Sequence, residues 1–470
     1  VSTDYTTSDK LYFEPLTVED VMNVVELEQP LGVIASLGGQ TAINLAEPLM
    51  KRGVTIIGTD VAAIEKAENR DSFEHIMTQL GIPQPKGQAV TNIEAGVKAA
   101  AEIGYPVLVR PSYVLGGRGM EVVYDPENLT KYMDAAVGVT PDRPILIDRF
   151  LNHAMECEAD AISDGTHAFV PAVMEHIELA GVHSGDSACI IPSRHISEKN
   201  VKTIKEYTRK IAEEMGVKGL MNMQYAIEND KVYVLEANPR ASRTVPLVSK
   251  VCNIRMVPLA IDIVTSELTG RPSPVPGLKE KNIPYYGVKE SVFPFNMFQE
   301  VDPVLGPEMR STGEVLGLSE FYGEAFFKAQ EATQTKLPMS GTVLISVCDK
   351  VAKSFADAGF HILATKGTQK VLADAGIVSE FVYKLSEGRP NISDLITNGK
   401  IDLIINTPRG ADGTLDDSYL RKAAIRKKIP YITTMAAAKA TASGIESMNK
   451  PGCGVVRSLQ ELHSTITDKE

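Results

Sequence analysis

The sequence predicts an α/β protein built from more than one domain. Short strand-like runs alternate with amphipathic helical stretches at both ends of the chain, in residues 1–66 and 336–470. Between them, residues 67–270 contain strands along which polar and apolar side chains alternate. A chain of 470 residues is long enough for two or three domains. We therefore expect domains at 1–66, 67–270 and 336–470, with 271–335 as the closing segment and linker of the second.

The composition, with 43% hydrophobic and 23% charged residues, is that of an ordinary globular protein. The net charge of −12 argues against nucleic acid as a main partner. We find no signal peptide and no apolar run near the ~20 residues of a membrane span, so we expect a cytoplasmic protein. Five scattered cysteines predict reduced thiols: Cys157, Cys189, Cys252, Cys348 and Cys453. Because the chain opens at Val1 in the middle of a pattern, we expect a fragment.

Residues 1–66 predict a doubly wound α/β unit that lacks its beginning. We expect helices at Val18–Glu28 and Ala42–Lys51 and strands at Leu31–Ser36 and Val54–Gly58. The apolar stripe of the first helix would consist of Val21, Val24, Val25 and Leu27. Gly38 and Gly39 make a turn before the second helix. This turn either seats an anion at the helix N-terminus or is only a tight turn.

The second domain begins with a helix from Asn69 to Gly81 and a strand that ends at Arg110. The loop that follows contains Gly116 and Gly117, which allow backbone N–H groups to approach a phosphate closely. Its spacing does not match G-x-x-x-x-G-K-[ST], which argues against a Walker-type site. The loop is equally explained as a mobile hairpin, because the sheet resumes at Glu121.

Acidic residues mark the next strands, which we expect at Ile145–Asp148 and Glu156–Ile162. Glu156, Glu158 and Asp160 share one face, and three acids on one face are most often solvated, which is our expectation here. The alternative assigns Glu156 to a ribose or a cation. His183 lies in the run His-Ser-Gly-Asp among acids and glycines, which favours a site. A helix should run from its N-cap Ser197 through Met215 and end at Gly216.

The clearest chemical signal follows the strand at Lys231–Leu235. Glu236 and Asn238 come at its end, and Arg240 and Arg243 follow at once. Carboxylate and amide oxygens suit Mg²⁺, and guanidinium groups bind phosphate oxygens bidentately. Possible metal ligands beside arginines that can bind phosphate indicate a site of phosphoryl transfer. The alternative is a set of surface salt bridges.

The register of this strand against Met221–Ile227 decides whether Gln224 joins the cation site. A three-residue loop, Asn229–Lys231, places Gln224 opposite Glu236 on one face, whereas a two-residue loop places them on opposite faces. We expect the three-residue loop.

The last third of the chain restarts the α/β alternation. Residues 271–335 are first Pro-rich and suggest no chemistry of their own, although Glu290 is a candidate acid. Beyond them we expect strands at Thr342–Val347, Phe360–Thr365, Asp402–Thr407 and Tyr431–Thr434 and helices at Asp349–Ala358 and Asp416–Lys428. The helix start at Thr365–Thr368 is either a phosphate cradle or an ordinary N-cap.

Five motifs of the chain resemble those of a known family: VSTDYTTSDKLYFEP, SLGGQT, RPSYVLGGRGM, GVHSGDSA and LEANPRASRTVP. Over essentially its whole length the chain resembles the second half of the large chain of carbamoyl phosphate synthetases. The resemblance implies a partial Rossmann-like pre-ATP-grasp unit, an α+β ATP-grasp domain that uses MgATP to phosphorylate carbamate, and a methylglyoxal-synthase-like allosteric domain. It also implies, as partners, the N-terminal half of the large chain and a glutaminase small subunit.

Matching motifs imply roles for individual residues. Nucleotide contacts would come from Arg70, Arg110, Gly116, Gly117, Arg149, Leu151, Glu156, Gly181, Val182, His183, Ser184, Gln224 and Glu236. The ligands of Mg²⁺ or Mn²⁺ would be Gln224, Glu236 and Asn238, with K⁺ as a further candidate ion. Arg243, Arg240 and His183 would act on the transferring phosphoryl group. Arg149 departs from the His or Glu of relatives.

The same resemblance implies an effector site for a nucleotide monophosphate or ornithine in residues 336–470. The phosphate and ribose pocket would be lined by Ser346, Thr365, Thr368, Lys384 and Asn406, and the ornithine side by Tyr431 and Thr433. Pro408 stands where another hydroxyl is expected.

Two rival functions stay open. One is a different ATP-grasp ligase, of the biotin-carboxylase or purine-pathway kind, because it would use the same metal and phosphate groups. The other is a regulatory module that binds nucleotide without turnover.

Overall fold

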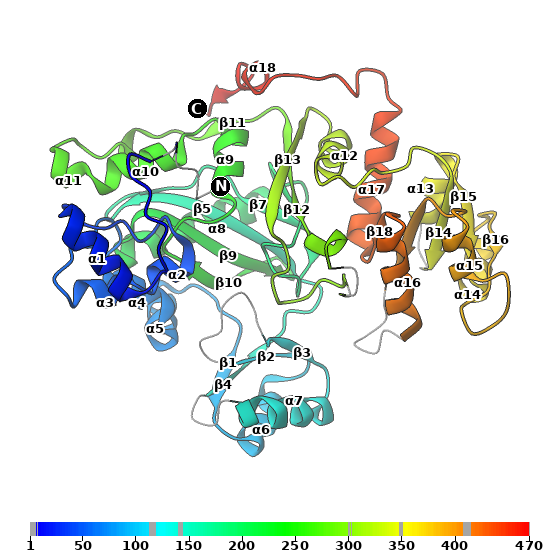
Figure 1. The fold of residues 1–470 in the computed structure, drawn as a ribbon, viewed down its shortest axis with the longest axis horizontal. Coiled ribbons are helices and arrows are strands. Elements are labelled where there is room, and N and C mark those ends of the chain that lie inside the picture. The colour runs from blue at the N-terminus through cyan, green and yellow to red at the C-terminus, as the bar shows by residue number, and fades with distance from the viewer. Residues whose placement is uncertain are drawn as a thin grey trace.

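The computed structural model describes residues 6, 8–111, 119–139, 144–298, 301, 303–346, 351–407 and 415–469. An eight-stranded sheet forms the centre of the molecule, with a four-stranded sheet below it and a five-stranded sheet at one side in Figure 1. The predicted α/β class is confirmed. Within the described ranges, no helix combines the length and apolarity needed to cross a bilayer.

The first unit is less regular than the sequence predicts. Its helices are α1 (Val18–Glu28), α2 (Gly39–Ile43), α3 (Ala46–Met50) and α4 (Val61–Glu68). The prediction of two strands is wrong. The two segments are joined by a single parallel bridge between Val33 and Ile56, and neither pairs with another strand among the described residues. In the predicted apolar stripe of α1, Val21, Val24 and Val25 are half-buried and Leu27 is 69% exposed, and no residue of this helix is fully buried.

The expected helix from Ala42 to Lys51 is divided into α2 and α3. Pro48 has no N–H with which to bond the carbonyl of Asn44, so one continuous helix cannot form there. The predicted helix after it is confirmed as α5 (Arg70–Leu80), which begins at the N-cap Asn69 and ends at Gly81, whose φ is 66°.

The four-stranded antiparallel sheet has the order β1-β4-β2-β3. Its strands are β1 (Gly87–Val90), β2 (Val107–Pro111), β3 (Glu121–Val123) and β4 (Ile145–Arg149), and its helices are α6 (Ile93–Ile103) and α7 (Pro126–Val139). Val107, Val109 and Ile147 pack against Leu129 and Met133 in a core of its own. The loop with Gly116 and Gly117 lies outside the described residues.

The central sheet has the order β10-β9-β5-β7-β8-β12-β13, with β6 beside β5. Its strands are β5 (Met155–Asp164), β6 (Ala168–Phe169), β7 (Met174–Leu179), β8 (Cys189–Ile191), β9 (Lys218–Glu228), β10 (Lys231–Asn238), β12 (Tyr286–Val292) and β13 (Gly313–Ser319). Its helical elements are α8 (Glu198–Met215), α9 (Val245–Cys252), α10 (Met256–Val264), α11 (Ser266–Thr269), η1 (Val275–Gly277), η2 (Pro294–Asn296) and α12 (Tyr322–Ala332). Because β12 and β13 come from residues 271–335, that segment completes the central sheet.

The hairpin β9–β10 has the predicted pairing of Gln224 with Glu236, but not the predicted turn. Its turn has two residues, Asn229 and Asp230, with φ of 52° and 60°, so the predicted three-residue loop is wrong. Val234 pairs with Tyr225, and the next pair is Glu236 with Gln224, which leaves Leu235 as the extra residue of a bulge. The bulge shifts the alternation by one residue, so Gln224 and Glu236 share one face as predicted.

The C-terminal sheet is parallel throughout, in the order β16-β15-β14-β17-β18. Its strands are β14 (Thr342–Ser346), β15 (His361–Ala364), β16 (Glu380–Phe381), β17 (Leu403–Asn406) and β18 (Tyr431–Ile432). The helices are α13 (Val351–Asp357), α14 (Lys366–Asp374), α15 (Ile392–Thr397), α16 (Leu415–Arg426) and α17 (Met435–Met448). The expected alternation is therefore present.

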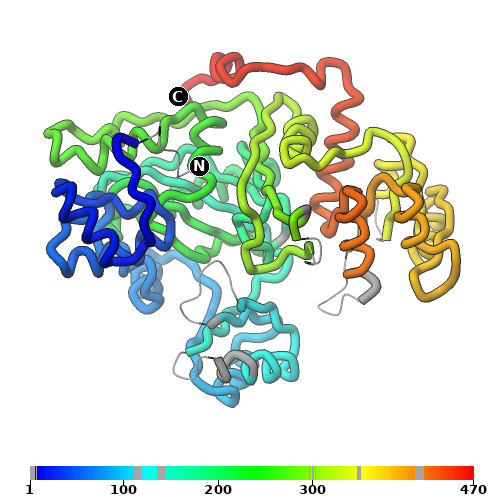
Figure 2. Tube along the Cα trace, viewed as in Figure 1, coloured from blue at the N-terminus to red at the C-terminus, as the bar shows by residue number. Residues whose placement is uncertain are grey.

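The end of the chain returns to the central part of the molecule. Helix α17 packs on α12, and a final segment carries α18 (Leu459–His463) and β19 (Thr467–Asp468). Figure 2 shows this red segment running back over the central part of the trace. Strand β19 pairs with β11 (Lys281–Asn282). The division at residue 336 stays a prediction, and this strand pair joins segments from both sides of it.

Candidate active site

The end of hairpin β9–β10 gathers the three predicted metal ligands. Gln224 lies opposite Glu236, and Asn238 lies opposite Asn222. The Asn238 amide nitrogen donates to Glu236 Oε1 at 3.0 Å, and the Gln224 amide nitrogen donates to Ser184 Oγ at 2.7 Å. The second bond leaves the Gln224 amide oxygen for a cation. A carboxylate and two amide oxygens form a hard donor set that fits Mg²⁺.

The loop after β7 supplies His183 to the same region. His183 Nδ1 accepts the backbone N–H of Gly185 at 3.0 Å, so in the neutral ring the proton lies on Nε2. Burial lowers the pKa of His183, although Asp186 and Glu236 act in the opposite direction. A neutral imidazole with an Nε2–H donor can hydrogen-bond to an oxyanion of a substrate.

Gly181, which precedes this loop, requires its glycine. Its φ is 104°, and an added Cβ would lie 3.2 Å from the ring of Phe150. The Gly181 N–H donates to Glu156 Oε1 at 3.2 Å, so two predicted nucleotide contacts lie beside each other.

The acidic face of β5 is not solvated, and that expectation is wrong. Glu158 is 3% and Asp160 1% exposed. Strands β7 and β9 flank β5, His176 contacts Glu158, and the loop with Ser242 and Thr244 contacts Asp160. Asp160 accepts hydrogen bonds from Ser242, Thr244 and Asn222, and burial raises its pKa to about 6. Asp160 therefore holds the loop that follows hairpin β9–β10.

A buried histidine lies between the other two acids of β5. His176 Nε2 is 3.4 Å from Glu158 Oε1, and Nδ1 is 3.7 Å from Glu156 Oε2. The pKa of His176 is raised by Cys189, Glu156 and Glu158 although burial opposes it, and the pKa of Glu158 is lowered by His176 against its own burial. Cys189 lies close to both side chains. Glu156 and Glu158 therefore flank the two ring nitrogens of His176.

The two arginines after β10 have different surroundings. Arg240 donates to Asn238 Oδ1 at 3.0 Å, to the Ala241 carbonyl at 3.2 Å and to Gln40 Oε1 at 3.1 Å. Arg243 is more open, and its Nη1 is 3.0 Å from both Ser311 Oγ and Glu314 Oε1.

A second group of predicted contacts lies on the four-stranded sheet. Asp148 binds Arg70 at 2.8 Å and Arg110 at 3.2 Å, so one carboxylate orients both guanidiniums. Arg149 pairs with Glu228 at 2.7 Å. Leu151 is buried in an apolar cluster with Ala154 and Ala226, against which Ala180, Tyr233 and Leu235 pack. This cluster joins the two sheets and is suited to the flat apolar face of a nucleobase.

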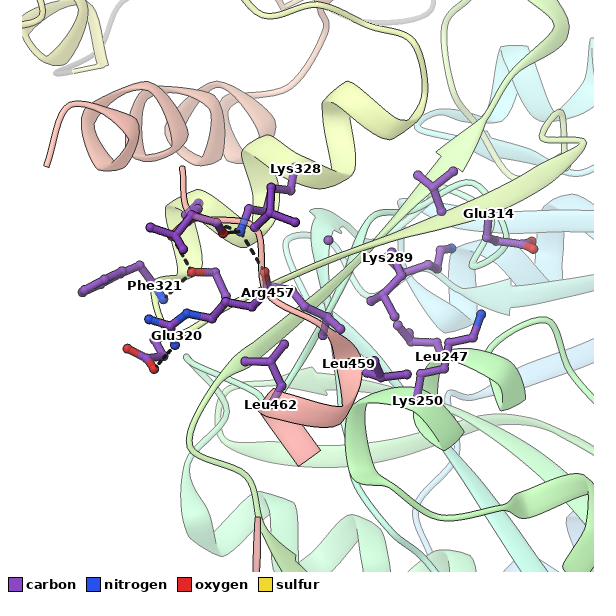
Figure 3. A pocket seen from close by; sticks show the side chains of 18 of the residues that line it. Leu247, Lys250, Lys289, Glu314, Glu320, Phe321, Lys328, Arg457, Leu459 and Leu462 are labelled. Atoms are coloured by element: carbon purple, nitrogen blue, oxygen red, sulfur yellow. Dashed lines mark hydrogen bonds and ion pairs between the residues drawn. The ribbon is translucent and has the colours of Figure 1, made fainter. Parts of the chain in front are cut away.

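The sequence analysis did not identify three residues that lie at this site. They are Lys289 on β12, Glu314 on β13 and Ser311 between the two strands. Lys289 is 2% exposed and donates to the carbonyls of Ser184 and Gly185, both at 3.3 Å. With Arg243 and Glu314 it lines a cavity of about 790 Å³, and Figure 3 labels Lys289 and Glu314 on one side of it. The signal available in the sequence was a lysine in the middle of a strand-like run.

The predicted effector residues follow the carboxyl ends of adjacent parallel strands. Ser346 ends β14 and pairs in register with Asn406, which ends β17. Thr365 and Thr368 lie at the start of α14 and are buried, whereas Lys384 is exposed. The Asn406 amide donates to the Tyr431 hydroxyl at 2.8 Å, and Thr433 follows β18. This edge is where ligands of parallel α/β sheets bind. Pro408 lies outside the described residues.

Comparison with known families matches three segments. Residues 1–66 match the carbamoyl phosphate synthase preATP-grasp domain, residues 69–268 the ATP-binding domain of the carbamoyl-phosphate synthase L chain, and residues 348–433 an MGS-like domain.

Two curated relatives are each named carbamoyl phosphate synthase large chain, C-terminal section. That of Methanopyrus kandleri is 49% identical over 98% of this chain and 88% of its own length. That of Aquifex aeolicus is 48% identical over 99% and 91%. The carbamoyl phosphate synthase large chain of Archaeoglobus fulgidus is 50% identical over 98% of this chain, but this chain spans 43% of its length.

Solved structures share the fold at low identity. A biotin carboxylase from Campylobacter jejuni has a TM-score of 0.53 and 17% identity over 66% of this chain and 76% of its own. The biotin carboxylase domain of a Hydrogenobacter thermophilus 2-oxoglutarate carboxylase, solved with MgADP and bicarbonate, has a TM-score of 0.55 and 17% identity over 70% and 81%. The central part of the chain therefore has the ATP-grasp fold.

Proposed function

Because the chain belongs to the carbamoyl phosphate synthase large-chain family, we propose that it phosphorylates carbamate with ATP and Mg²⁺ to give carbamoyl phosphate and ADP. The observation that carries this proposal is the convergence of Gln224, Glu236 and Asn238 at one hairpin end, with Arg243 following in the same loop. A carbamate oxygen attacks the γ-phosphorus, and the bond from that phosphorus to the leaving ADP oxygen breaks.

The side chains divide this work. Gln224, Glu236 and Asn238 hold Mg²⁺ or Mn²⁺, which supplies positive charge to the phosphate oxygens when bound. Arg243 and neutral His183 donate to the transferring phosphoryl group and to carbamate. Arg70, Arg110, Glu156, Gly181, Val182 and Ser184 position the nucleotide, and Leu151 and Arg149 lie near its base. Gly116 and Gly117 belong to the proposed phosphate loop. K⁺ remains a further candidate ion.

A different ATP-grasp ligase is the second candidate, because biotin carboxylases share the fold. The relatives that match the chain over nearly its whole length favour carbamate. The third candidate, a nucleotide-binding module without turnover, is disfavoured by an intact donor set at Glu236 and Asn238.

The partners are part of the proposal. The chain spans less than half of the Archaeoglobus fulgidus large chain, so we propose an N-terminal half that makes carbamate and a glutaminase small subunit that supplies ammonia. Carbamoyl phosphate would feed arginine and pyrimidine biosynthesis in the cytoplasm. A nucleotide monophosphate or ornithine would bind residues 336–470, at the carboxyl edge of the parallel sheet.

The test is the reverse reaction, ATP formation from carbamoyl phosphate and MgADP, because it needs neither proposed partner. We expect the purified chain to make ATP, and Glu236→Gln to lose most of this activity while keeping its thermal midpoint. A folded chain that binds MgADP but makes no ATP from carbamoyl phosphate refutes autonomous catalysis.

A further inference from the structure

We infer that Gln40, in the Gly-Gly-Gln-Thr turn of the first unit, is a positioning residue for the metal site at the end of β10. It acts through Arg240 on Asn238 and Glu236. This inference rests on the proposed function, because it takes Glu236 and Asn238 as the metal ligands.

The first link is the side chain of Gln40, which lies 200 residues from its partner in the sequence. Its amide oxygen accepts from Arg240 Nε at 3.1 Å. Its amide nitrogen donates to Asn44 Oδ1 at 3.1 Å and to Glu68 Oε1 at 2.5 Å. These partners set the orientation of the amide, because only its oxygen can accept from a guanidinium and only its nitrogen can donate to a carboxylate.

The second link is Arg240, whose three guanidinium nitrogens all have protein acceptors. Besides Gln40, they bind the Ala241 carbonyl and Asn238 Oδ1. The side chain is half-buried. These bonds use three of the five N–H donors of the guanidinium and hold it against Gln40, Ala241 and Asn238.

The third link is Asn238. Its oxygen accepts from Arg240 and its nitrogen donates to Glu236 Oε1 at 3.0 Å, so Arg240 determines which way this amide faces. An amide oxygen has two lone pairs, and the second stays available to a cation. The contacts therefore run from Gln40 through Arg240 and Asn238 to Glu236.

The backbone of the turn supports the same arrangement. Gly39 has a φ of 72°, and a Cβ on Gly38 would lie 2.5 Å from that of Ala42, so both glycines are needed for this turn. The Ala241 N–H donates to the Ser36 carbonyl at 2.8 Å, which joins the turn to the loop after β10. Helix α2 has only five residues, so we assign the turn to the presentation of Gln40 and not to anion binding.

Loss of a side chain that orients metal ligands typically costs about 10- to 100-fold in metal affinity. We expect this loss in Gln40→Leu, which keeps the size of the side chain and removes all three of its hydrogen bonds. Gln79→Leu, at an exposed position on α5, is the matched control. In Gln40→Glu an acceptor for Arg240 remains but the new carboxylate faces Glu68. The double variant Gln40→Glu/Glu68→Gln removes that repulsion and should recover metal affinity.

The experiment measures Mn²⁺ affinity by electron paramagnetic resonance in the full chain with ADP bound, and metal-free ADP affinity by calorimetry. Weaker Mn²⁺ binding in Gln40→Leu with unchanged ADP affinity, and recovery in the double variant, would establish the positioning role. Wild-type Mn²⁺ affinity in Gln40→Leu overturns it. If Gln40→Leu does not fold, equal Mn²⁺ affinity in Gln40→Glu and the double variant overturns it instead. A wild-type chain that binds Mn²⁺ but makes no ATP refutes the proposed function alone.

Discussion

A buried acid on β12 should make the stability of the chain depend on pH in an unusual direction. Glu290 is 8% exposed, and burial raises its pKa to about 7 from 4.5. Its carboxylate accepts from the Ser291 N–H at 3.0 Å and from the Gln330 amide at 2.6 Å. Glu290→Gln keeps the shape of the side chain and removes its titration, and the Gln330 amide can rotate to accept from the new amide.

The sign and the size of this pH effect follow from the pKa values of Glu290 in the unfolded and folded chain. Since the folded state holds the proton more tightly, the stability contribution of Glu290 is fully present below pH 4.5 and is lost as the pH rises to about 7. A shift of roughly 2.5 pH units corresponds to about 3 kcal/mol. The wild-type chain and Glu290→Gln should therefore unfold alike near pH 4.5, and the wild type should be less stable by up to about 3 kcal/mol above pH 7.

The assay compares urea unfolding of both chains from pH 4.5 to 8, followed by hydrogen exchange of β12 so that the transition is assigned to this sheet. Glu324→Gln is the control, because the pKa of Glu324 is lowered by Lys328 and Ser319 despite its burial. Its stability contribution is present above pH 4.5 and is lost on acidification, so this substitution should destabilise the chain at pH 7. A difference between wild type and Glu290→Gln that does not change with pH would refute the assignment.

The remaining predictions concern the metal, the turn and the effector. Glu236→Gln should lower ATP formation about 10²- to 10³-fold, the scale for one preorganised electrostatic group, and full turnover at saturating Mg²⁺ would remove Glu236 from the metal site. Asn229→Ala should lower the free energy of unfolding by about 1 kcal/mol, because φ is 52°, whereas Asn229→Gly should be tolerated, and equal denaturation midpoints would contradict this. Thr368→Ala and Lys384→Ala should weaken binding of a nucleotide monophosphate. A bound effector should shift the affinity for ATP by about 5- to 150-fold, and calorimetry must find the same factor for effector binding when ATP is present.

Local signals in the sequence were sufficient for elements whose ends depend on nearby residues. Ser197 accepts the N–H of Asn200 at the start of α8, and Gly216 ends that helix with a φ of 73°. These interactions join residues within a few positions of each other, so the helix could be predicted without knowledge of the fold. The predicted metal ligands Gln224, Glu236 and Asn238 likewise came from residue type and from the resemblance of their motifs, and the structure places them at the end of one hairpin.

Only the tertiary structure decided what surrounds these residues. The face shared by Glu156, Glu158 and Asp160 was predicted correctly, but its burial depends on β7, β9 and the other segments packed over β5, which no local pattern specifies. The pairing of Gln224 with Glu236 depends on a bulge at Leu235, and its sequence contains no glycine or turn signal.

The contacts of Gln40 with Arg240 and of Lys289 with Ser184 join residues 200 and 105 positions apart. The sequence by itself thus determined the α/β class and most of the strand and helix order, but not the breaks in the first unit. The long-range packing determined which acids are buried, which register the hairpin takes and which acceptors each arginine contacts. The physical reason is that burial and pairing are properties of neighbours in space, whereas capping and turn preferences act between neighbours in the chain.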